Sequence, residues 1–318
     1  MPTRAFAGAE SPCNRRLQAK PIWQSKQETD PTMTTDALTE ILTVERIEDN
    51  FFRGIETPQG EGRMFGGQVL GQALMAAVRT VEPEKVNHSL HAYFMRPGDA
   101  TKPVLYRVER DMDGNSFATR RVIAIQNGQP ILNMAASFQV QEEGMSYATE
   151  MPAGIPAPED CMTEKQMAEA LGDKLPESFR RFLRWNRPVE IRPCQMMPPF
   201  SEDPVTGESY RWIKTKAAMP DDPNLHRGAL VYSSDMGLIG VALAVHGVTF
   251  HTPGMRVASL DHAIWIHSDF RMDDWLLFCM ESPWTGGGRG LTRARFFTRD
   301  GRLVATVAQE GMTRRKQV

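Results

Sequence analysis

Three polar residues in the second half of the sequence stand where the surrounding pattern is apolar. Gln309 continues an every-second-residue alternation that begins at Leu303, so its amide shares the inward face of a predicted strand. Asp235 stands at the start of a predicted apolar helix, and Ser259 precedes a predicted strand. A carboxylate can take up a proton, whereas a hydroxyl and an amide can hold a reactant in position by hydrogen bonds. These three residues are therefore the candidates for chemistry.

Each of the three also has an ordinary structural interpretation. An aspartate near a helix start usually accepts hydrogen bonds from free backbone N–H groups. A serine at a strand edge is most often structural. A buried amide without a partner raises the free energy of the fold by about 1–3 kcal/mol, so Gln309 needs either water or a partner. The pattern alone leaves both interpretations open.

The elements that must position these residues occur twice in the chain. Sliding the sequence along itself places Asn127-Gly128 on Asp300-Gly301. Asn-Gly and Asp-Gly are strong hairpin signals, because both central residues of a type I′ turn need positive φ. Alternating segments flank each turn, so the sequence predicts two matching β-hairpins.

A predicted helix and strand precede each hairpin in the same order. Residues 67–79 and 235–245 have helical periodicity and are apolar over much of their circumference, which favours burial. His91-Ala92 and His262-Ala263 then match in the strands that follow. We therefore predict an α+β fold of two repeats, each a helix wrapped by an antiparallel sheet, with the two sheets continuous.

The boundaries of these repeats follow from composition and periodicity. We expect a disordered N-terminal extension over 1–35, a first repeat over 36–140, a connector over 141–204 and a second repeat over 205–318. Nine of the 22 prolines lie between 152 and 204, which excludes one continuous helix or strand there. Short helices are predicted at 162–171 and 177–185 within the connector.

Composition excludes several classes of function. The chain has 318 residues, 41% of them hydrophobic, and a net charge of −2, which argues against nucleic-acid binding. No apolar run is long enough to span a membrane. The four cysteines stand far apart without a CxxC pair, a pattern that fits a reducing compartment. The motifs Gly-x-Ser-x-Gly, the P-loop and His-Glu-x-x-His are absent, so we expect no cofactor and no metal.

Several ordered strings in the chain carry a family resemblance. They are Phe51–Gly54, Phe65–Ala73, His88–Asp99, Asp113–Phe117, Ser234-Asp235, Ala258–Ala263, Trp275–Leu277, Glu281-Ser282 and Gln309–Gly311. Together they resemble the acyl-CoA thioesterase II family over roughly residues 38–314. The resemblance implies a double hotdog fold, which agrees with the repeat, and hydrolysis of fatty acyl-CoA to free fatty acid and CoA.

The resemblance also implies which residues act. The family's catalytic residues fall on Asp235, Ser259 and Gln309. Our hypothesis is that water attacks the thioester directly, with Asp235 as general base and the other two residues positioning water and carboxylate. Gln309 could alternatively stabilise the oxyanion.

Substrate binding is expected to involve His88, Gly67 and Arg289. Arg289 belongs to a cluster of five arginines within residues 289–302, which could bind the phosphates of CoA or could form a solvated strand face. Arg289 follows three glycines, where backbone and side chain could both approach a ligand.

Two other functions are compatible with the predicted fold. An enoyl-CoA hydratase or dehydratase could use it, although Gly98-Asp99 does not continue into the hydratase string. A non-catalytic acyl-CoA-binding protein is the second alternative. We further expect a homo-oligomer, either dimer or tetramer, and a cytoplasmic location, because residues 315–318 lack a Ser-Lys-Leu-type peroxisomal address.

Overall fold

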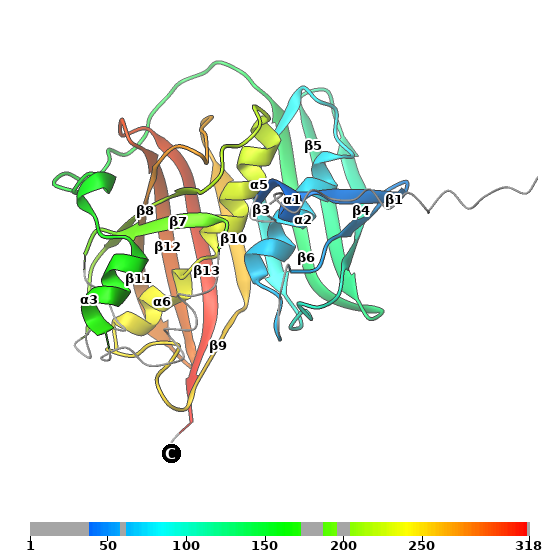
Figure 1. Ribbon diagram of the computed structural model, residues 1–318. Coiled ribbons are helices and arrows are strands. Elements are labelled where there is room, and N and C mark those ends of the chain that lie inside the picture. Colours follow the sequence, from blue (N-terminus) through cyan, green and yellow to red (C-terminus); the bar gives the residue numbers. More distant parts are fainter. Residues whose placement is uncertain (1–37, 58–61, 173–186, 196–203, 317–318) are drawn as a thin grey trace, which may run out of the picture. The chain divides into compact units, whose positions relative to one another are not determined.

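The strands of the chain form one antiparallel sheet. The computed structural model describes residues 38–57, 62–172, 187–195 and 204–316, which belong to one folded unit. The strand order in this sheet is β1-β2-β4-β5-β6-β3-β10-β13-β12-β11-β8-β7, and β9 pairs with β13 off this path. Figure 1 shows the first half of the chain at one end of the sheet and the second half at the other.

The strand bounds follow the alternation of buried and exposed side chains. In the first half they are β1 (Val44–Glu48), β2 (Phe51–Gly54), β3 (Lys85–Phe94), β4 (Val104–Asp113), β5 (Phe117–Gln126) and β6 (Gln129–Val140). In the second half they are β7 (Val189–Pro193), β8 (Ser209–Thr215), β9 (Met255–Ser259), β10 (Asp261–Ile266), β11 (Leu276–Gly286), β12 (Arg289–Thr298) and β13 (Leu303–Arg315).

Strands β3 and β10 join the two halves into one sheet. His91 pairs with Ala263, and Ala92 pairs with His262. These are the residues that the repeat matches, so each half presents the same edge to the other around an approximate two-fold axis. This pairing confirms the predicted continuous sheet of two helix-in-sheet repeats.

Helices fill the inner side of the sheet. The helical elements are α1 (Leu38–Leu42), α2 (Gly66–Val78), the 3₁₀ turn η1 (Pro158–Asp160), α3 (Glu164–Leu171), α5 (Pro223–Ser234) and α6 (Leu238–Ala244). Helix α2 packs on β3 to β6, and α6 packs on β11 to β13. Helix α5 lies against α2 and so connects the cores of both halves (Figure 1). Nearly every residue of α2 and α6 is buried, as their apolar composition predicts.

The second apolar helix begins later than predicted. The predicted helix does not include residues 235–237, because Gly237 has a φ of 72°, in the left-handed region. Helix α6 therefore starts at Leu238, and Asp235 instead follows the last residue of α5. The prediction that Asp235 opens its own helix was wrong.

The two predicted hairpins form with different turns. Asn127 and Gly128 have φ angles of 51° and 72°, as a type I′ turn requires. Gly301 has a φ of 91°, but Asp300 is not in the left-handed region. The second hairpin has a longer loop between β12 and β13, closed by a hydrogen bond from the Thr298 N–H to the Arg302 carbonyl.

The proline-rich connector adds structure to the second half. Its first predicted helix is present as α3, whose N-terminus is closed by a capping box between Thr163 and Gln166. The second predicted helix, at 177–185, lies outside the described residues. Strand β7, which the sequence did not lead us to expect, pairs with β8 at the sheet edge.

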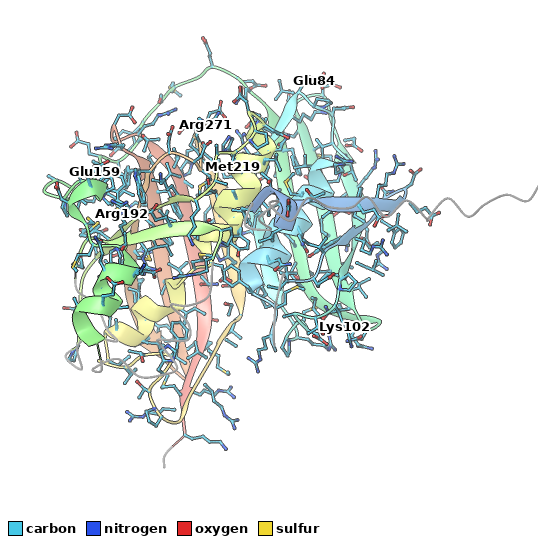
Figure 2. The ribbon with its side chains drawn as sticks, in the orientation of Figure 1. Glu84, Lys102, Glu159, Arg192, Met219 and Arg271 are labelled. Atoms are coloured by element: carbon cyan, nitrogen blue, oxygen red, sulfur yellow. The ribbon has the colours of Figure 1, made fainter. Side chains whose placement is uncertain are left out.

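Two charged side chains mark the outside of the first half. Glu84 and Lys102 are exposed at opposite ends of the first half's strands (Figure 2). Within the described ranges, none of the helices combines the length and the apolar composition needed to cross a bilayer.

The close approach of α2 to α5 predicts the effect of one substitution. A Cβ on Gly67 would overlap the carbonyl oxygen of Tyr232, which is backbone and cannot rotate away. We expect Gly67→Ala to lower the free energy of unfolding by about 1–3 kcal/mol, measured by chemical denaturation. The control is Gly144→Ala, where a Cβ meets nothing within 4 Å. Equal stability of the two variants would contradict the tight helix contact.

Candidate active site

Asp235, Ser259 and Gln309 meet in three dimensions although they lie on three separate elements. The Gln309 Nε2 donates to Asp235 Oδ1 at 2.6 Å and lies 3.2 Å from Ser259 Oγ. The Ser259 hydroxyl faces the same Asp235 oxygen at 3.5 Å. Asp235 ends α5, Ser259 ends β9 and Gln309 lies on the inner face of β13, so the sheet and one helix end together form the cluster.

Asp235 is held against the other half of the molecule. Phe65 precedes α2 and makes no side-chain capping hydrogen bond, so it leaves N–H groups of the first turn without that partner. The Asp235 carboxylate accepts a hydrogen bond from the Gly67 N–H there. A Cβ on Gly66 would lie 2.7 Å from Asp235 Oδ2, so the glycine admits the carboxylate. Asp235 is thus a helix cap, as its structural interpretation predicted. The helix that it caps is α2, and not the helix that follows it in the sequence.

The end of α5 is fixed to the sheet beside Asp235. The Ser234 Oγ lies 2.8 Å from Nε2 of His262, which is on β10. Burial lowers the pKa of His262 to about 3, so this imidazole is neutral and structural at neutral pH. The hydrogen bond between Ser234 and His262 therefore restrains the end of α5, next to which Asp235 lies.

Burial and hydrogen bonding act in opposite directions on Asp235. Removal from water raises the pKa of its carboxyl group from 3.8 to about 6, while hydrogen bonds from Gln309, Gly67 and Ser259 lower it. A pKa near 6 leaves most Asp235 side chains ionised at pH 7 and still basic enough to accept a proton. A carboxylate tuned in this way, inside a cavity, is typical of a general base.

Gln309 is placed to orient both neighbours. Its side chain is 1% exposed, which excludes the solvated strand end. An amide group has two N–H donors, and Asp235 and Ser259 lie within reach of both. The Gln309 Oε1 is buried and has no hydrogen-bond partner among the described residues. Thr292 holds the backbone by donating its hydroxyl proton to the Gln309 carbonyl at 3.1 Å.

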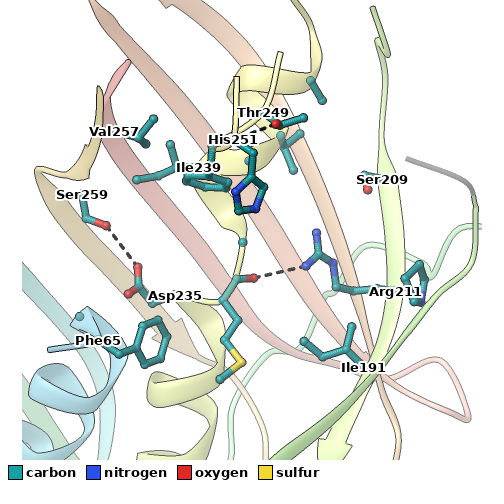
Figure 3. Close-up of a pocket in the computed structure, with 18 of the residues that line it drawn as sticks. Phe65, Ile191, Ser209, Arg211, Asp235, Ile239, Thr249, His251, Val257 and Ser259 are labelled. Atoms are coloured by element: carbon teal, nitrogen blue, oxygen red, sulfur yellow. Dashed lines mark hydrogen bonds between the residues drawn. The ribbon is translucent and has the colours of Figure 1, made fainter. Parts of the chain in front are cut away.

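A cavity of about 490 Å³ opens beside Asp235 and Ser259 (Figure 3). Much of its wall is apolar, and the apolar residues include Met64, Phe65, Met236, Ile239, Val241, Val248, Phe250 and Val257. The Phe65 ring packs edge-on against Tyr232 of α5, with ring centroids 5.1 Å apart. The catalytic candidates therefore border a space that suits an aliphatic chain.

The other predicted binding residues lie in different places. Gly67 contacts Asp235 through its backbone, as described above. His88 lies on β3 with its Nε2 2.8 Å from the Ser137 hydroxyl, and it does not line this cavity. Arg289 pairs with Glu310 at 2.8 Å and does not line it either. Binding roles for His88 and Arg289 stay predictions.

The arginine cluster on β12 is mostly neutralised by carboxylates of this chain. Besides Arg289, the pairs are Arg293–Glu281, Arg295–Glu208 and Arg299–Glu159. These contacts favour the solvated strand face over a phosphate site, because an arginine that already pairs with a carboxylate gains less from a phosphate.

Sequence reasoning missed several polar residues that line the cavity, among them Glu164, Arg187, Arg211 and His251. A signal for Arg211 was present, since it alternates with Ser209 and Ile213 on the inward face of β8. Glu164 and Arg187 form an ion pair and come from the connector, where no periodicity assigned a face. His251 lies in a loop before β9.

Comparison with known protein families agrees with this geometry. Residues 179–312 match the family model "Acyl-CoA thioesterase", and residues 55–139 match "Acyl-CoA thioesterase N-terminal domain". The chain is 39% identical over 277 residues to "Acyl-CoA thioesterase 2" of Haemophilus influenzae, which covers 87% of this chain and 96% of the relative.

Solved structures are similar in fold. An acyl-CoA thioesterase II from Mycobacterium marinum superimposes with a TM-score of 0.72 at 41% identity, covering 88% of this chain and 99% of that one. A protein with a hot dog fold from Alicyclobacillus acidocaldarius has a TM-score of 0.68 at 16% identity over 87% of this chain and 98% of its own. The double hotdog fold that the family resemblance implied, and with which the repeat agrees, is thereby confirmed.

The raised pKa of Asp235 predicts a pH effect on stability. Between the unfolded value of 3.8 and the folded value of about 6, the folded protein binds more protons at this site, so stability falls as pH rises through that window. Relative to Asp235→Asn, we expect the wild type to lose about 3 kcal/mol of unfolding free energy between about pH 3.5 and pH 7. Denaturant titrations at several pH values measure this, and a constant difference between the two proteins would refute it.

Proposed function

The chain belongs to the acyl-CoA thioesterase family, and on that premise we propose that it hydrolyses fatty acyl-CoA to free fatty acid and CoA with Asp235, Ser259 and Gln309 as catalytic residues. The observation that carries the assignment is the meeting of these three side chains, two of which, Asp235 and Ser259, line a largely apolar cavity. The acyl chain occupies the cavity, and the thioester carbon lies next to Asp235.

Water attacks the thioester carbon directly in this proposal. The water donates one proton to the Asp235 carboxylate, which acts as general base. Because Ser259 Oγ donates its proton to Asp235 Oδ1 and accepts a hydrogen bond from Gln309 Nε2, one lone pair of the hydroxyl oxygen is left to accept a hydrogen bond from the water. The second proton of the water is then held by Ser259, and a lone pair of the water oxygen attacks. Fixing the water in this way removes part of the entropic barrier.

The role of Gln309 follows from its hydrogen bonds. Both amide protons are directed to Asp235 and Ser259, which leaves no donor for the oxyanion. This supports the orienting role over oxyanion stabilisation. We assign the oxyanion to the Gly66 N–H at the start of α2, because the Gly67 N–H already donates to Asp235 and the Gln68 N–H to the Phe65 carbonyl. The helix dipole favours negative charge at this position.

The reaction is completed by collapse of the tetrahedral intermediate. The carbon–sulfur bond breaks, the new carbon–oxygen bond remains in the fatty acid, and the CoA thiolate leaves. Asp235 returns the proton that it took from water to the thiolate sulfur, which restores the carboxylate. No acyl group is attached to the protein at any stage.

The two alternative functions are less well supported. A hydratase needs a group that adds a proton to carbon, and no histidine contacts the Asp235 cluster in the described hydrogen bonds. A non-catalytic binding protein does not require a buried carboxylate with a pKa raised to about 6. Loss of the conjugated double bond of an enoyl-CoA would indicate the first alternative, and binding without thiol release the second.

We also propose a homo-oligomer that acts in lipid metabolism in the cytoplasm. Tyr93 and Trp265 are exposed on the outer face of the two central strands, with exposed fractions of 62% and 37%. Large aromatic side chains in such positions are typical of an interface. The free thiols of Cys161, Cys194 and Cys279 fit a reducing compartment.

Removing the proposed base gives the first kinetic prediction. Asp235→Asn keeps the size of the side chain but cannot take up the proton, so we expect kcat to fall by a factor on the order of 10² to 10⁴. Ser259→Ala and Gln309→Ala should lower kcat less, because the base remains. Release of CoA thiol, followed with a chromogenic thiol reagent, measures the rates.

The matched control is Asp274→Asn, an exposed aspartate whose loss should leave kcat unchanged. Near-wild-type activity of Asp235→Asn would contradict the assignment of the base. A burst of CoA together with an acylated peptide containing Ser259, found by mass spectrometry, would replace the direct attack of water by a covalent route.

The pH profile gives the second kinetic prediction. Asp235 must be ionised to act, so kcat/KM should rise with pH and level off above an apparent pKa of about 6. The residual activity of Asp235→Asn should lack this limb. If the variant keeps the same acidic limb as the wild type, a group other than Asp235 controls it.

A further inference from the structure

The cavity beside Asp235 contains a cation that the hydrolysis does not use. Arg211 extends from β8 into the same space as Asp235, Ser259 and Ile239 (Figure 3). Its Nη1 donates to the Met236 carbonyl at 3.4 Å, a long hydrogen bond. Met236 directly follows Asp235 in the sequence. The Arg211 guanidinium and the proposed catalytic carboxylate of Asp235 therefore lie on the wall of the same cavity.

The positive charge of Arg211 is poorly compensated. Among the described residues, no carboxylate oxygen lies within ion-pair distance of its guanidinium. Glu164 is the carboxylate whose charge acts on Arg211, but it forms its ion pair with Arg187. One carboxylate therefore compensates the charges of two guanidinium groups. Desolvation lowers the pKa of Arg211 to about 10, and it stays charged at neutral pH.

The guanidinium also has donors to spare. Arginine carries five N–H donors, and one hydrogen bond, to Met236, is made to the described protein. The Arg211 Cζ lies 5.9 Å from the centre of the Phe278 ring, which packs against one face of the group. A Cβ on Gly237 would lie 2.8 Å from Nη1, so the absence of a side chain there lets the guanidinium reach the cavity.

A planar guanidinium with free donors is the preferred partner of a carboxylate. We propose that Arg211 binds a carboxylate at the far end of the acyl chain, and that this cavity takes ω-carboxyacyl thioesters, the CoA esters of dicarboxylic acids, in preference to monocarboxylic ones. The inference rests on the proposed function, because it assumes that the acyl chain occupies the cavity.

The composition of the wall supports this substrate class over the phosphates of CoA. Apolar side chains such as Met236, Ile239 and Val241 line the cavity together with Arg211, and they suit methylene groups. The nucleotide part of CoA is larger and carries several charges, which these apolar side chains would leave unpaired. A single carboxylate on an aliphatic chain matches Arg211, because Arg187, the other guanidinium in the wall, already pairs with Glu164.

The test compares thioesters that differ in the terminal group alone. The pairs are succinyl- and butyryl-CoA, adipyl- and hexanoyl-CoA, and suberyl- and octanoyl-CoA, each pair having the same number of carbons. For the pair that best spans the distance to Arg211, we expect the wild type to have a higher kcat/KM for the dicarboxylic member. Arg211→Met should lower the ratio of the two kcat/KM values about tenfold or more, and Arg211→Lys should restore part of it.

The matched control is Lys214→Met, which removes a cation from the same strand. Lys214 lies over the Trp275 ring, 5.0 Å from its centre, outside the cavity. Its loss should leave the ratio unchanged. Thermal unfolding of each variant checks that the fold is retained.

The outcomes separate this inference from the proposed function. Absence of thiol release from every thioester would overturn hydrolysis itself. Hydrolysis of monocarboxylic thioesters with no preference for any dicarboxylic partner would overturn the role of Arg211 alone. An equal loss on both members of a pair in Arg211→Met would also overturn it, because a purely structural contact to Met236 would act on all substrates alike.

Pantetheine thioesters of suberate and octanoate distinguish the remaining source of an anion, the CoA phosphates. If Arg211 binds the acyl carboxylate, the selectivity change in Arg211→Met persists with these nucleotide-free substrates. If the effect of the substitution disappears with them, Arg211 contacts a phosphate and the proposal fails.

Discussion

The Asp235 carboxylate at the start of α2 is the interaction on which the site depends. It joins the end of α5 to a helix of the other half, and it needs both glycines there, because a side chain on Gly66 or Gly67 would meet Asp235 or the Tyr232 carbonyl. The same contact sets the chemistry. Helix N–H groups stabilise the ionised carboxylate, which burial would otherwise protonate at neutral pH.

The duplicated fold also explains why the two halves differ in chemistry. Where the repeat places Asp235 in the second half, the first half has Gln68, which is 1% exposed. Its amide is engaged by the Thr57 hydroxyl at 2.8 Å and by the Ile55 carbonyl at 3.1 Å. A neutral amide with its own partners cannot take a proton from water. Within the described part of the chain, both copies of the repeat therefore supply scaffold, and only the second copy has the carboxylate that we propose as the base.

The sequence predicted the parts of this structure that depend on local patterns. The repeat, the hairpins and the inward face of Gln309 follow from periodicity and turn chemistry, which act over a few residues. The helix start at Leu238 depends on Gly237, which has a left-handed conformation and lies close to Arg211 of another element, so the local pattern missed it. That Asp235 caps α2 rather than its own helix is a contact between halves, which no local pattern contains. The ion pairs of the β12 arginines are likewise visible in three dimensions alone.

Arg211 illustrates how a residue that does no chemistry can still shape a site. A guanidinium in an apolar wall destabilises the free protein, because its desolvation is compensated by one long hydrogen bond and a shared carboxylate. A substrate carboxylate would offset the desolvation cost of the guanidinium. Binding of an acyl chain that carries such a carboxylate would therefore be more favourable. An aliphatic chain end would leave the cation unpaired and gain nothing from it. On this proposal the asymmetry turns an uncompensated charge into selectivity, while the proposed base Asp235 and its partners keep the same hydrolytic step for any thioester that enters.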